Sequence, residues 1–300
     1  MKLSFRFMFY GILILFLVVS CKKRESNSKD VVSIKGSDTM VNLTQKWAET
    51  YMKRYNDLSI HVTGGGSGTG VAALLNGTAT IANISRELKE REYLNAKERG
   101  IEPYQIKVAL DGIAIIVNPE NKIDTLLIEQ LKDIFSGKIK NWAEVGGSDD
   151  KIVLYGRENS SGTYEYFKGV ILENEEENFT TDFATSTQVL QGTSSLGEAV
   201  ALDKRGIGYG GVGYFVGRKD LKILYIKSDK NSEAVTPAEN GNVNYEIIRN
   251  GKYPLARYLY CYTNGKPTGV LKNYIDFITS AEGQKIVEDM EYIPLNATGN

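Results

Sequence analysis

Four times along the chain, a short segment of branched apolar residues ends in a turn of small, hydroxyl-bearing residues, and an amphipathic segment follows at once. The hydroxyls of these turns belong to Ser37 and Thr39, Ser67 and Thr69, Ser85, and Ser161 and Thr163. Short strands that alternate with helices are typical of an α/β protein. The chain is therefore predicted to have an α/β fold, and its 300 residues are enough for two lobes.

The clarity of the pattern varies along the chain. The apolar positions of 40–52 recur at steps of three or four residues, which predicts a helix with one buried face. Residues 272–290 are predicted to form one continuous helix near the C-terminus. By contrast, 219–251 is polar and has no clear period, so no structure is predicted for it.

The N-terminus has the features of a targeting signal. Two basic residues precede an apolar segment, 7–19, which is shorter than the roughly 20 residues that a membrane span needs. A small residue, Ser20, stands directly before Cys21, as in the processing site of a bacterial lipoprotein. Residues 1–20 are therefore predicted to be a signal peptide and Cys21 to be lipidated. An uncleaved anchor, or an ordinary signal peptide followed by a chance cysteine, is the alternative.

A polar segment, 21–30, then predicts a flexible tether between the lipid and the folded body. Acyl chains on Cys21 would fix the protein to a bacterial membrane outside the cytoplasm, on the periplasmic side or at the cell surface. The bilayer is thus one predicted partner.

The composition excludes several classes of function. A net charge of −1 gives no global field that would attract nucleic acid. With Cys21 lipidated, the other cysteine, Cys261, has no partner for a disulfide, and its apolar, aromatic surroundings predict a buried thiol. His61 is the sole histidine, which argues against a histidine-rich metal site and leaves one poor candidate for a Ser-His-Asp triad. No metal and no cofactor are predicted.

The four turns offer the groups that bind an oxyanion. A helix start presents free backbone N–H groups and the positive end of the helix dipole, and an anion there needs no net positive charge. The hydroxyls add donors, and Gly66, Gly68 and Gly162 allow the backbone to approach an oxyanion closely. Arg86 and Arg157 each follow one of the strands and can provide a planar pair of donors.

Each turn alone is weak evidence, because a Ser or Thr at a helix start is usually a simple cap. The segment 64–70 is also not a Walker phosphate loop, since Gly70 stands where that loop needs Lys. Four hydroxyl-bearing turns together with two arginines favour an oxyanion site, although they do not specify phosphate.

An ordered set of motifs over about 31–295 makes the prediction more specific. The motifs are Ile34-Lys35-Gly36-Ser37-Asp38-Thr39-Met40, Trp47-Ala48-Glu49, 64–70, Ile84-Ser85-Arg86-Glu87-Leu88, Ile134-Phe135-Ser136-Gly137 with Asn141-Trp142, 157–163 and Gly206-Ile207-Gly208-Tyr209. Together they resemble the phosphate-binding subunit of bacterial phosphate ABC transporters. The resemblance implies a two-lobed, periplasmic-binding-protein-like (type II) fold, with lobe 1 formed by 31–116 plus 250–300 and lobe 2 by 117–249.

The same resemblance implies a binding protein and not an enzyme. It would bind inorganic phosphate as a monomer by hydrogen bonds alone and deliver it to the membrane permease. The phosphate contacts that it implies are Ser37, Thr39, Ser67, Ser85, Arg86, Arg157, Ser161, Gly162 and Thr163.

One position departs from the family pattern. Some members have an aspartate where this chain has Arg86, and that carboxylate can accept the proton of a partly protonated phosphate. Sulfate has no such proton and would face an unpaired carboxylate. We expect Asp38 to take this role, with Glu158 and Asn159 as weaker candidates. The alternative is that Asp38 simply caps its helix.

Three other functions stay open at this stage. The site could bind another oxyanion, such as sulfate or molybdate, through the same chemistry. The chain could be a serine hydrolase that uses Ser67 or Ser161, although neither lies in a Gly-x-Ser-x-Gly motif. It could also sense phosphate without feeding a transporter.

Overall fold

The computed structural model describes residues 30–55, 58–174 and 179–295. The predicted signal peptide, Cys21 and all of the tether except Asp30 lie outside these residues. Among the described residues, no helix is both long and apolar enough to cross a lipid bilayer.

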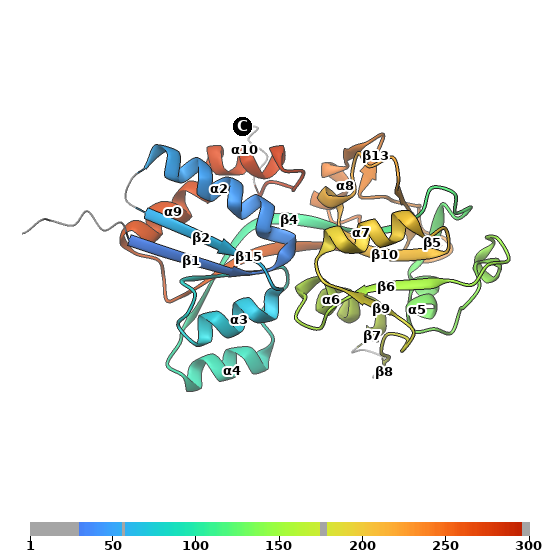
Figure 1. Ribbon diagram of the computed structural model, residues 1–300, viewed down its shortest axis with the longest axis horizontal. Helices are drawn as coiled ribbons and strands as arrows, with labels where there is room; N and C mark the ends of the chain where they lie inside the picture. The colour runs from blue at the N-terminus through green and yellow to red at the C-terminus, as the bar shows by residue number, and fades with distance from the viewer. Residues whose placement is uncertain (1–29, 56–57, 175–178, 296–300) are drawn as a thin grey trace, which may run out of the picture.

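Two α/β lobes lie side by side and are connected along two long strands, β4 (Pro103–Val117) and β15 (Ala256–Asn264) (Figure 1). The first lobe also contains β1 (Asp30–Gly36), η1 (Asp38–Met40), α2 (Val41–Arg54), β2 (Leu58–Thr63), α3 (Ser67–Leu75), β3 (Ile81–Ile84), α4 (Glu90–Glu98), α9 (Gly269–Thr279) and α10 (Ala281–Asp289). The second lobe contains β5 (Thr125–Leu127), α5 (Ile128–Phe135), η2 (Trp142–Val145), β6 (Val153–Arg157), α6 (Gly162–Phe167), η3 (Lys168–Leu172), β7 (Glu173–Asn174), β8 (Phe179–Thr180), β9 (Gln188–Leu190), α7 (Thr193–Leu202), β10 (Gly206–Gly211), η4 (Val212–Tyr214), β11 (Lys222–Ile223), β12 (Tyr225–Lys227), β13 (Ala238–Glu239), β14 (Asn242–Val243) and α8 (Tyr245–Arg249).

One path of paired strands runs through both lobes in the order β2-β1-β3-β15-β4-β10-β6-β9. In the first lobe β1 pairs in parallel with β2 and β3, and β15 runs antiparallel to β3 and β4. Strand β4 changes partners along its length, because 103–112 pairs with β15 and 113–117 pairs with β10. The chain therefore passes to the second lobe along β4 and returns at the start of β15.

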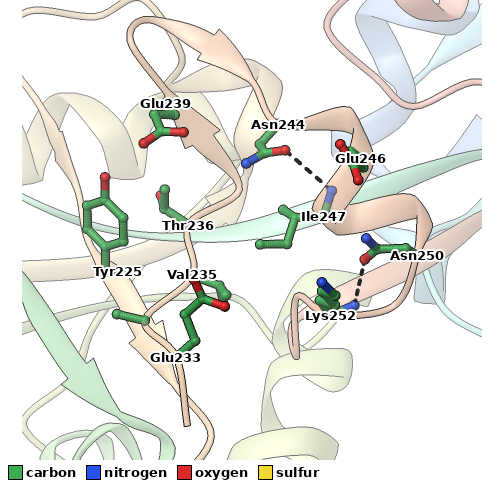
Figure 2. A pocket seen from close by; sticks show the side chains of 11 residues that line it. Tyr225, Glu233, Val235, Thr236, Glu239, Asn244, Glu246, Ile247, Asn250 and Lys252 are labelled. Atoms are coloured by element: carbon green, nitrogen blue, oxygen red, sulfur yellow. Dashed lines mark hydrogen bonds between the residues drawn. The ribbon is translucent and has the colours of Figure 1, made fainter.

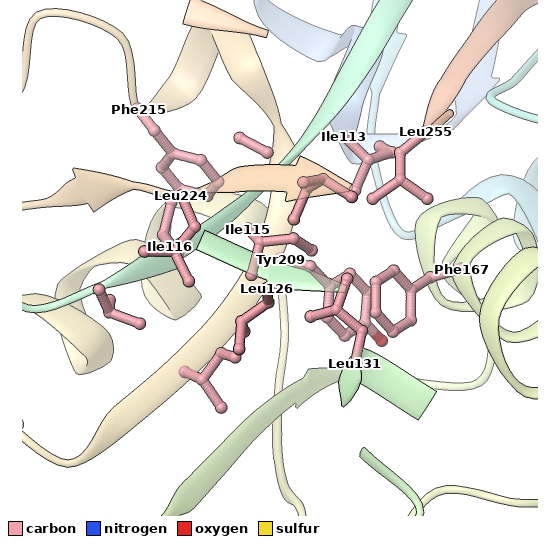
Figure 3. Close-up of a cluster of buried hydrophobic side chains, with 14 of the residues drawn as sticks. Ile113, Ile115, Ile116, Leu126, Leu131, Phe167, Tyr209, Phe215, Leu224 and Leu255 are labelled. Carbon is pink, nitrogen blue, oxygen red and sulfur yellow. The ribbon is translucent and has the colours of Figure 1, made fainter. Parts of the chain in front are cut away.

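Each lobe has its own hydrophobic core. In the second lobe, the rings of Phe167 and Tyr209 stack with centroids 4.0 Å apart, and branched residues of β4 pack around them (Figure 3). In the first lobe, the buried face of α2, including Trp47, packs with residues of the sheet and of α9 and α10. Ile113 to Ile116 and Tyr253 belong to the second core, although they lie a few residues outside the second lobe as predicted, 117–249. Those boundaries stay predictions.

Two predicted helices are wrong in detail. After the turn at Ser85, α4 begins only at Glu90, because Glu92 turns back to accept hydrogen bonds from the Lys89 N–H and from Arg86. The predicted helix over 272–290 is two helices, α9 and α10. They separate at Ser280, whose backbone is extended and whose hydroxyl accepts from the N–H of Gly283.

Candidate anion-binding site between the lobes

The first-lobe part of the site lies where β1 and β3 end. Gly36 has a φ of 144°, and a Cβ there would lie 2.1 Å from the Asn83 carbonyl oxygen, so only glycine permits this close approach of the two strands. The N–H of Ser37 donates to the same carbonyl at 2.8 Å. This turn leads into η1, where the Thr39 side chain is buried.

The glycine-rich loop 64–66 positions Ser67 at the first turn of α3. Gly65 and Gly66 have φ values of 113° and 88°, which non-glycine residues rarely adopt. Ser67 is fully buried, and its Oγ accepts from the Ser85 N–H at 3.0 Å and lies 3.2 Å from Ser85 Oγ. The turn before α3 and the turn after β3 therefore bring the hydroxyls of Ser67 and Ser85 together.

The second-lobe part of the site follows β6. Ser161 is the N-cap of α6, and its Oγ accepts from the N–H groups of Thr163 and Tyr164 at 3.2 and 3.3 Å. Ser161, Gly162 and Thr163 are all buried. The Ser161 hydroxyl oxygen is thus used as a helix cap, which leaves its single hydrogen as a donor.

The two parts meet directly across the lobe interface. Thr39 Oγ1 lies 3.1 Å from Thr163 Oγ1, and the Gly68 N–H donates to the Ser160 carbonyl at 2.9 Å. A Cβ on Gly162 would lie 2.1 Å from Ser67 Oγ and 2.5 Å from Ser85 Oγ, so its backbone lies against both serines. We call Thr39, Ser67, Ser85, Gly162 and Thr163 the inter-lobe hydroxyl cluster.

An ion pair beside this cluster also connects the lobes. Arg157, at the end of β6, donates from Nη2 to Asp38 Oδ2 at 2.9 Å, and from Nε and Nη2 to Glu158 at 3.0 Å. Its Nη1 donates to Thr193 Oγ1 at 2.8 Å. The other oxygen of Asp38 accepts from the Gly65 N–H at 2.8 Å. Asp38 therefore connects the glycine-rich loop of the first lobe with the end of β6 in the second, and it is engaged outside its own helix.

Arg86 stands apart from the hydroxyl cluster in its described contacts. Its Nη1 and Nη2 donate to the two carboxylate oxygens of Glu92 at 2.8 and 2.9 Å. Burial would raise the pKa of Glu92, but hydrogen bonds from Arg86 and the Lys89 N–H outweigh it and lower that pKa. Arg86 thus orders the approach to α4, and the prediction that it contacts the ligand stays a prediction.

Two further charged residues, Arg257 and Asp111, were not among the predicted site residues and lie opposite each other on β15 and β4. Asp111 Oδ2 accepts from Nε and Nη2 of Arg257 at 3.1 and 2.9 Å, and Nη2 also contacts Thr39 Oγ1 and Thr163 Oγ1 at 3.2 and 3.0 Å. Burial raises the pKa of Asp111, and the nearby Arg257 opposes that shift in part. The sequence signal for both residues was a charge within an apolar, strand-like segment. Asp111 and Arg257 each interrupt such a segment.

A surface pocket of about 290 Å³ lies elsewhere, in the second lobe (Figure 2). It is formed by 225–252, most of the segment for which the sequence predicted no structure. Asn244 lines it and caps α8 by accepting from the Ile247 N–H at 3.3 Å. None of the predicted site residues lines this pocket, so it is distinct from the hydroxyl cluster.

Groups for catalysis or metal binding do not gather at the cluster. His61 lies exposed on β2, with Nε2 3.3 Å from Ser59 Oγ, and neither Ser67 nor Ser161 has a recorded contact with it. Within the described part of the chain, no group of three or more His, Cys, Asp or Glu side chains could bind a metal ion. The chemistry available at the cluster is hydrogen-bond donation.

A two-lobed α/β protein with buried donors between its lobes has the architecture of a substrate-binding protein. Residues 23–282 match the model of a family described as the PBP superfamily domain. The chain is 33% identical to the phosphate-binding protein PstS of Pseudomonas aeruginosa over 279 residues, which cover 87% of this chain and 82% of that protein. It is also 33% identical to PstS of Bacillus subtilis over 276 residues, with 91% and 83% covered. The chain belongs to the PBP superfamily and, within it, to the family of PstS phosphate-binding proteins.

Solved structures agree with this assignment. A substrate-binding protein from Clostridium perfringens, solved with bound phosphate, aligns with a TM-score of 0.75 and 30% identity over 89% of this chain and 100% of its own. An ABC-type phosphate transport receptor from Vibrio cholerae aligns with a TM-score of 0.69 and 28% identity, over 87% of this chain and 99% of its own. The predicted two-lobed fold is confirmed, as is the prediction of a binding protein and not an enzyme.

Proposed function

We propose that this protein binds inorganic phosphate between its two lobes and delivers it to the membrane permease of an ABC importer. The observation that supports this most directly is the inter-lobe hydroxyl cluster, in which buried donors from both lobes converge. Such donors can replace the water shell of an oxyanion without a net positive charge. The names of the relatives and the phosphate bound in the C. perfringens structure support the same ligand.

Within this proposal, hydroxyls supply most of the contacts. Thr39, Ser67, Ser85 and Thr163 can each donate one hydrogen, and the backbone at Gly162 can approach a phosphate oxygen closely. Ser37, Asp38, Arg86, Arg157 and Ser161 complete the predicted set. Because donors come from both lobes, a bound anion would favour the closed arrangement of the lobes.

Asp38 is the proposed acceptor for the proton of a partly protonated phosphate. Each of its carboxylate oxygens already accepts one hydrogen bond, from Gly65 or from Arg157, and each retains a second lone pair. Glu158 is the weaker candidate because its described contacts are with Arg157 alone, whereas Asp38 contacts both lobes and directly precedes Thr39 of the hydroxyl cluster. An Asp38→Asn variant should therefore lose preference for phosphate over sulfate, as measured by competition with labelled phosphate; an unchanged preference would remove Asp38 from this role.

Competition also separates phosphate from the alternative ligands. We expect unlabelled phosphate to displace radiolabelled phosphate at far lower concentration than sulfate or molybdate does. Equal displacement by all three would make the site a general oxyanion site. Hydrolysis of p-nitrophenyl phosphate or p-nitrophenyl acetate above the rate of a Ser67→Ala variant would instead support the hydrolase alternative.

We also propose that the protein is attached to the outer side of a bacterial membrane through acylated Cys21 and acts as a monomer. The small residue before Cys21 and the polar segment after it support lipoprotein processing. Cells that express the wild-type chain should keep it in the membrane fraction and incorporate labelled fatty acid into it. A Cys21→Ala variant should do neither, and membrane attachment of that variant would favour an uncleaved anchor.

A further inference from the structure

Three arginines are buried, Arg86, Arg157 and Arg257, and they differ in how far their charge is already neutralised. Both terminal nitrogens of Arg86 donate to Glu92, and Arg157 donates to two carboxylates, those of Asp38 and Glu158. Arg257 pairs with a single oxygen of one carboxylate, Asp111 Oδ2. Nε of Arg86 also has no partner among the described residues, but Arg257 is the arginine whose contacts lie on the hydroxyl cluster and that has a whole terminal nitrogen, Nη1, without a partner.

The guanidinium of Arg257 has two edges that can each donate a pair of hydrogen bonds. The edge formed by Nε and Nη2 faces Asp111. The second hydrogen of Nη2 lies on the edge shared with Nη1, and Nη2 contacts both Thr39 Oγ1 and Thr163 Oγ1. The Nη1–Nη2 edge is thus directed to the side on which the two threonine hydroxyls meet.

Nη1 of Arg257 is buried and has no hydrogen-bond partner among the described residues. The residue as a whole is 5% exposed, so solvent has little access to its two N–H groups. Buried donors of a charged group are rarely left unpaired, because an unmade hydrogen bond of this kind is costly. A planar pair of N–H groups beside convergent hydroxyls matches two oxygens of a tetrahedral oxyanion.

Arg257 also fixes how the neighbouring hydroxyls can donate. Because Thr39 Oγ1 and Thr163 Oγ1 both accept from Nη2, their own hydrogens point away from the guanidinium. Thr39 belongs to the first lobe, Thr163 belongs to the second, and Arg257 lies on β15 close to the point where the chain returns to the first lobe. A single side chain therefore orients donors from both lobes.

We propose that Arg257 is a ligand-binding residue that donates from its Nη1–Nη2 edge to the bound phosphate. This deepens the proposed function and rests on it. Asp111, which lies behind Arg257 at the opposite position of β4, positions the guanidinium through its other edge.

The test is equilibrium dialysis of the full chain, purified in detergent and freed of ligand by unfolding and refolding, against radiolabelled phosphate. Removing Arg257 alone would leave the buried Asp111 without its cationic partner, so the informative variant is the double substitution Asp111→Asn/Arg257→Gln. The matched control is Asp111→Asn, which keeps the guanidinium. We expect the control to bind phosphate within about tenfold of wild type and the double variant to bind about a hundredfold more weakly than the control, the loss expected for two charge-assisted hydrogen bonds.

An Arg257→Lys variant supplies a second readout. It keeps the charge but loses the planar pair of donors, so we expect intermediate affinity, about tenfold below wild type. Equal affinity of the control and the double variant would overturn the proposal for Arg257 while wild-type binding still supported the proposed function. If thermal unfolding shows that the double variant is not folded, the Arg257→Lys variant becomes the test. Phosphate affinity of that variant equal to wild type would then overturn the proposal. Absence of binding by the wild type itself would remove the proposed function and this inference together.

Discussion

Replacement of Gly162 by alanine perturbs the lobe interface at its tightest point. The added Cβ would lie 2.1 Å from Ser67 Oγ, 2.5 Å from Ser85 Oγ and 2.8 Å from Ser67 Cβ. The hydroxyls can rotate away, but Ser67 Cβ cannot, since it is fixed to the backbone of α3. Carbon atoms are in favourable contact at about 3.5 Å, so the lobes must separate locally by about 0.7 Å.

A separation of that size breaks the contacts that depend on closure. The hydrogen bond from the Gly68 N–H to the Ser160 carbonyl, 2.9 Å long, would stretch to about 3.6 Å, beyond the useful range. A bound anion would lose donors of one lobe in the same way. Each hydrogen bond to a charged group contributes about 1.5–3 kcal/mol, so the loss of two weakens binding by roughly 10²- to 10⁴-fold.

Calorimetric titration with phosphate measures this effect. Gly169→Ala is the matched control, because a Cβ at Gly169 meets nothing within 4 Å. We expect the control to bind like wild type and Gly162→Ala to bind at least about a hundredfold more weakly, with a similar melting temperature. A folded Gly162→Ala variant with wild-type affinity would refute the argument that closure over Gly162 is part of binding.

Three further predictions concern stability and reactivity. Ser67→Ala leaves the Ser85 N–H without its acceptor and should lower the free energy of unfolding by about 1–3 kcal/mol in urea titrations. The pKa of Glu92 is lowered in the folded state, so its pairing with Arg86 stabilises the protein fully above the unfolded pKa near 4.5 and is lost as pH falls through the folded pKa. The melting temperature of wild type should therefore fall more steeply below pH 4.5 than that of Glu92→Gln, and parallel curves would contradict this. Burial raises the pKa of Cys261 to about 12, so peptide mapping after treatment with a thiol reagent at pH 8 should find this cysteine labelled in the unfolded protein and unlabelled in the folded one.

The sequence predicted those parts of the fold whose pattern is local. The α/β alternation and the helix with Trp47 on its buried face depend on short-range periodicity, and both are present. The break at Ser280 was not predicted because the apolar spacing continues through it. In the structure, Ser280 is both the C-cap of α9 and the N-cap of α10. The segment 219–251 forms very short strands and one short helix, α8, which leave no measurable period.

The site was predictable in its residue types more than in its pairings. The glycines and serines at the turns indicated the hydroxyl cluster, because tight glycine turns and serine helix caps depend only on the neighbouring backbone. The role of Arg157 depends on Asp38, a partner 119 residues away in the sequence. The partner of Arg86, Glu92, is only six residues away, but the two meet because the chain between β3 and α4 is not helical. The contact between Arg257 and Asp111 requires the antiparallel register of β15 on β4, which no local pattern contains.

Parallel calorimetric titrations of phosphate and sulfate into the full chain, after unfolding and refolding to remove bound ligand, test the central claim most directly. The expected result is one phosphate bound per chain with a Kd of about 1 µM or lower, and little or no heat from sulfate. Absence of phosphate binding by the correctly refolded protein would contradict the account, and equal binding of both anions would contradict its claim of phosphate selectivity.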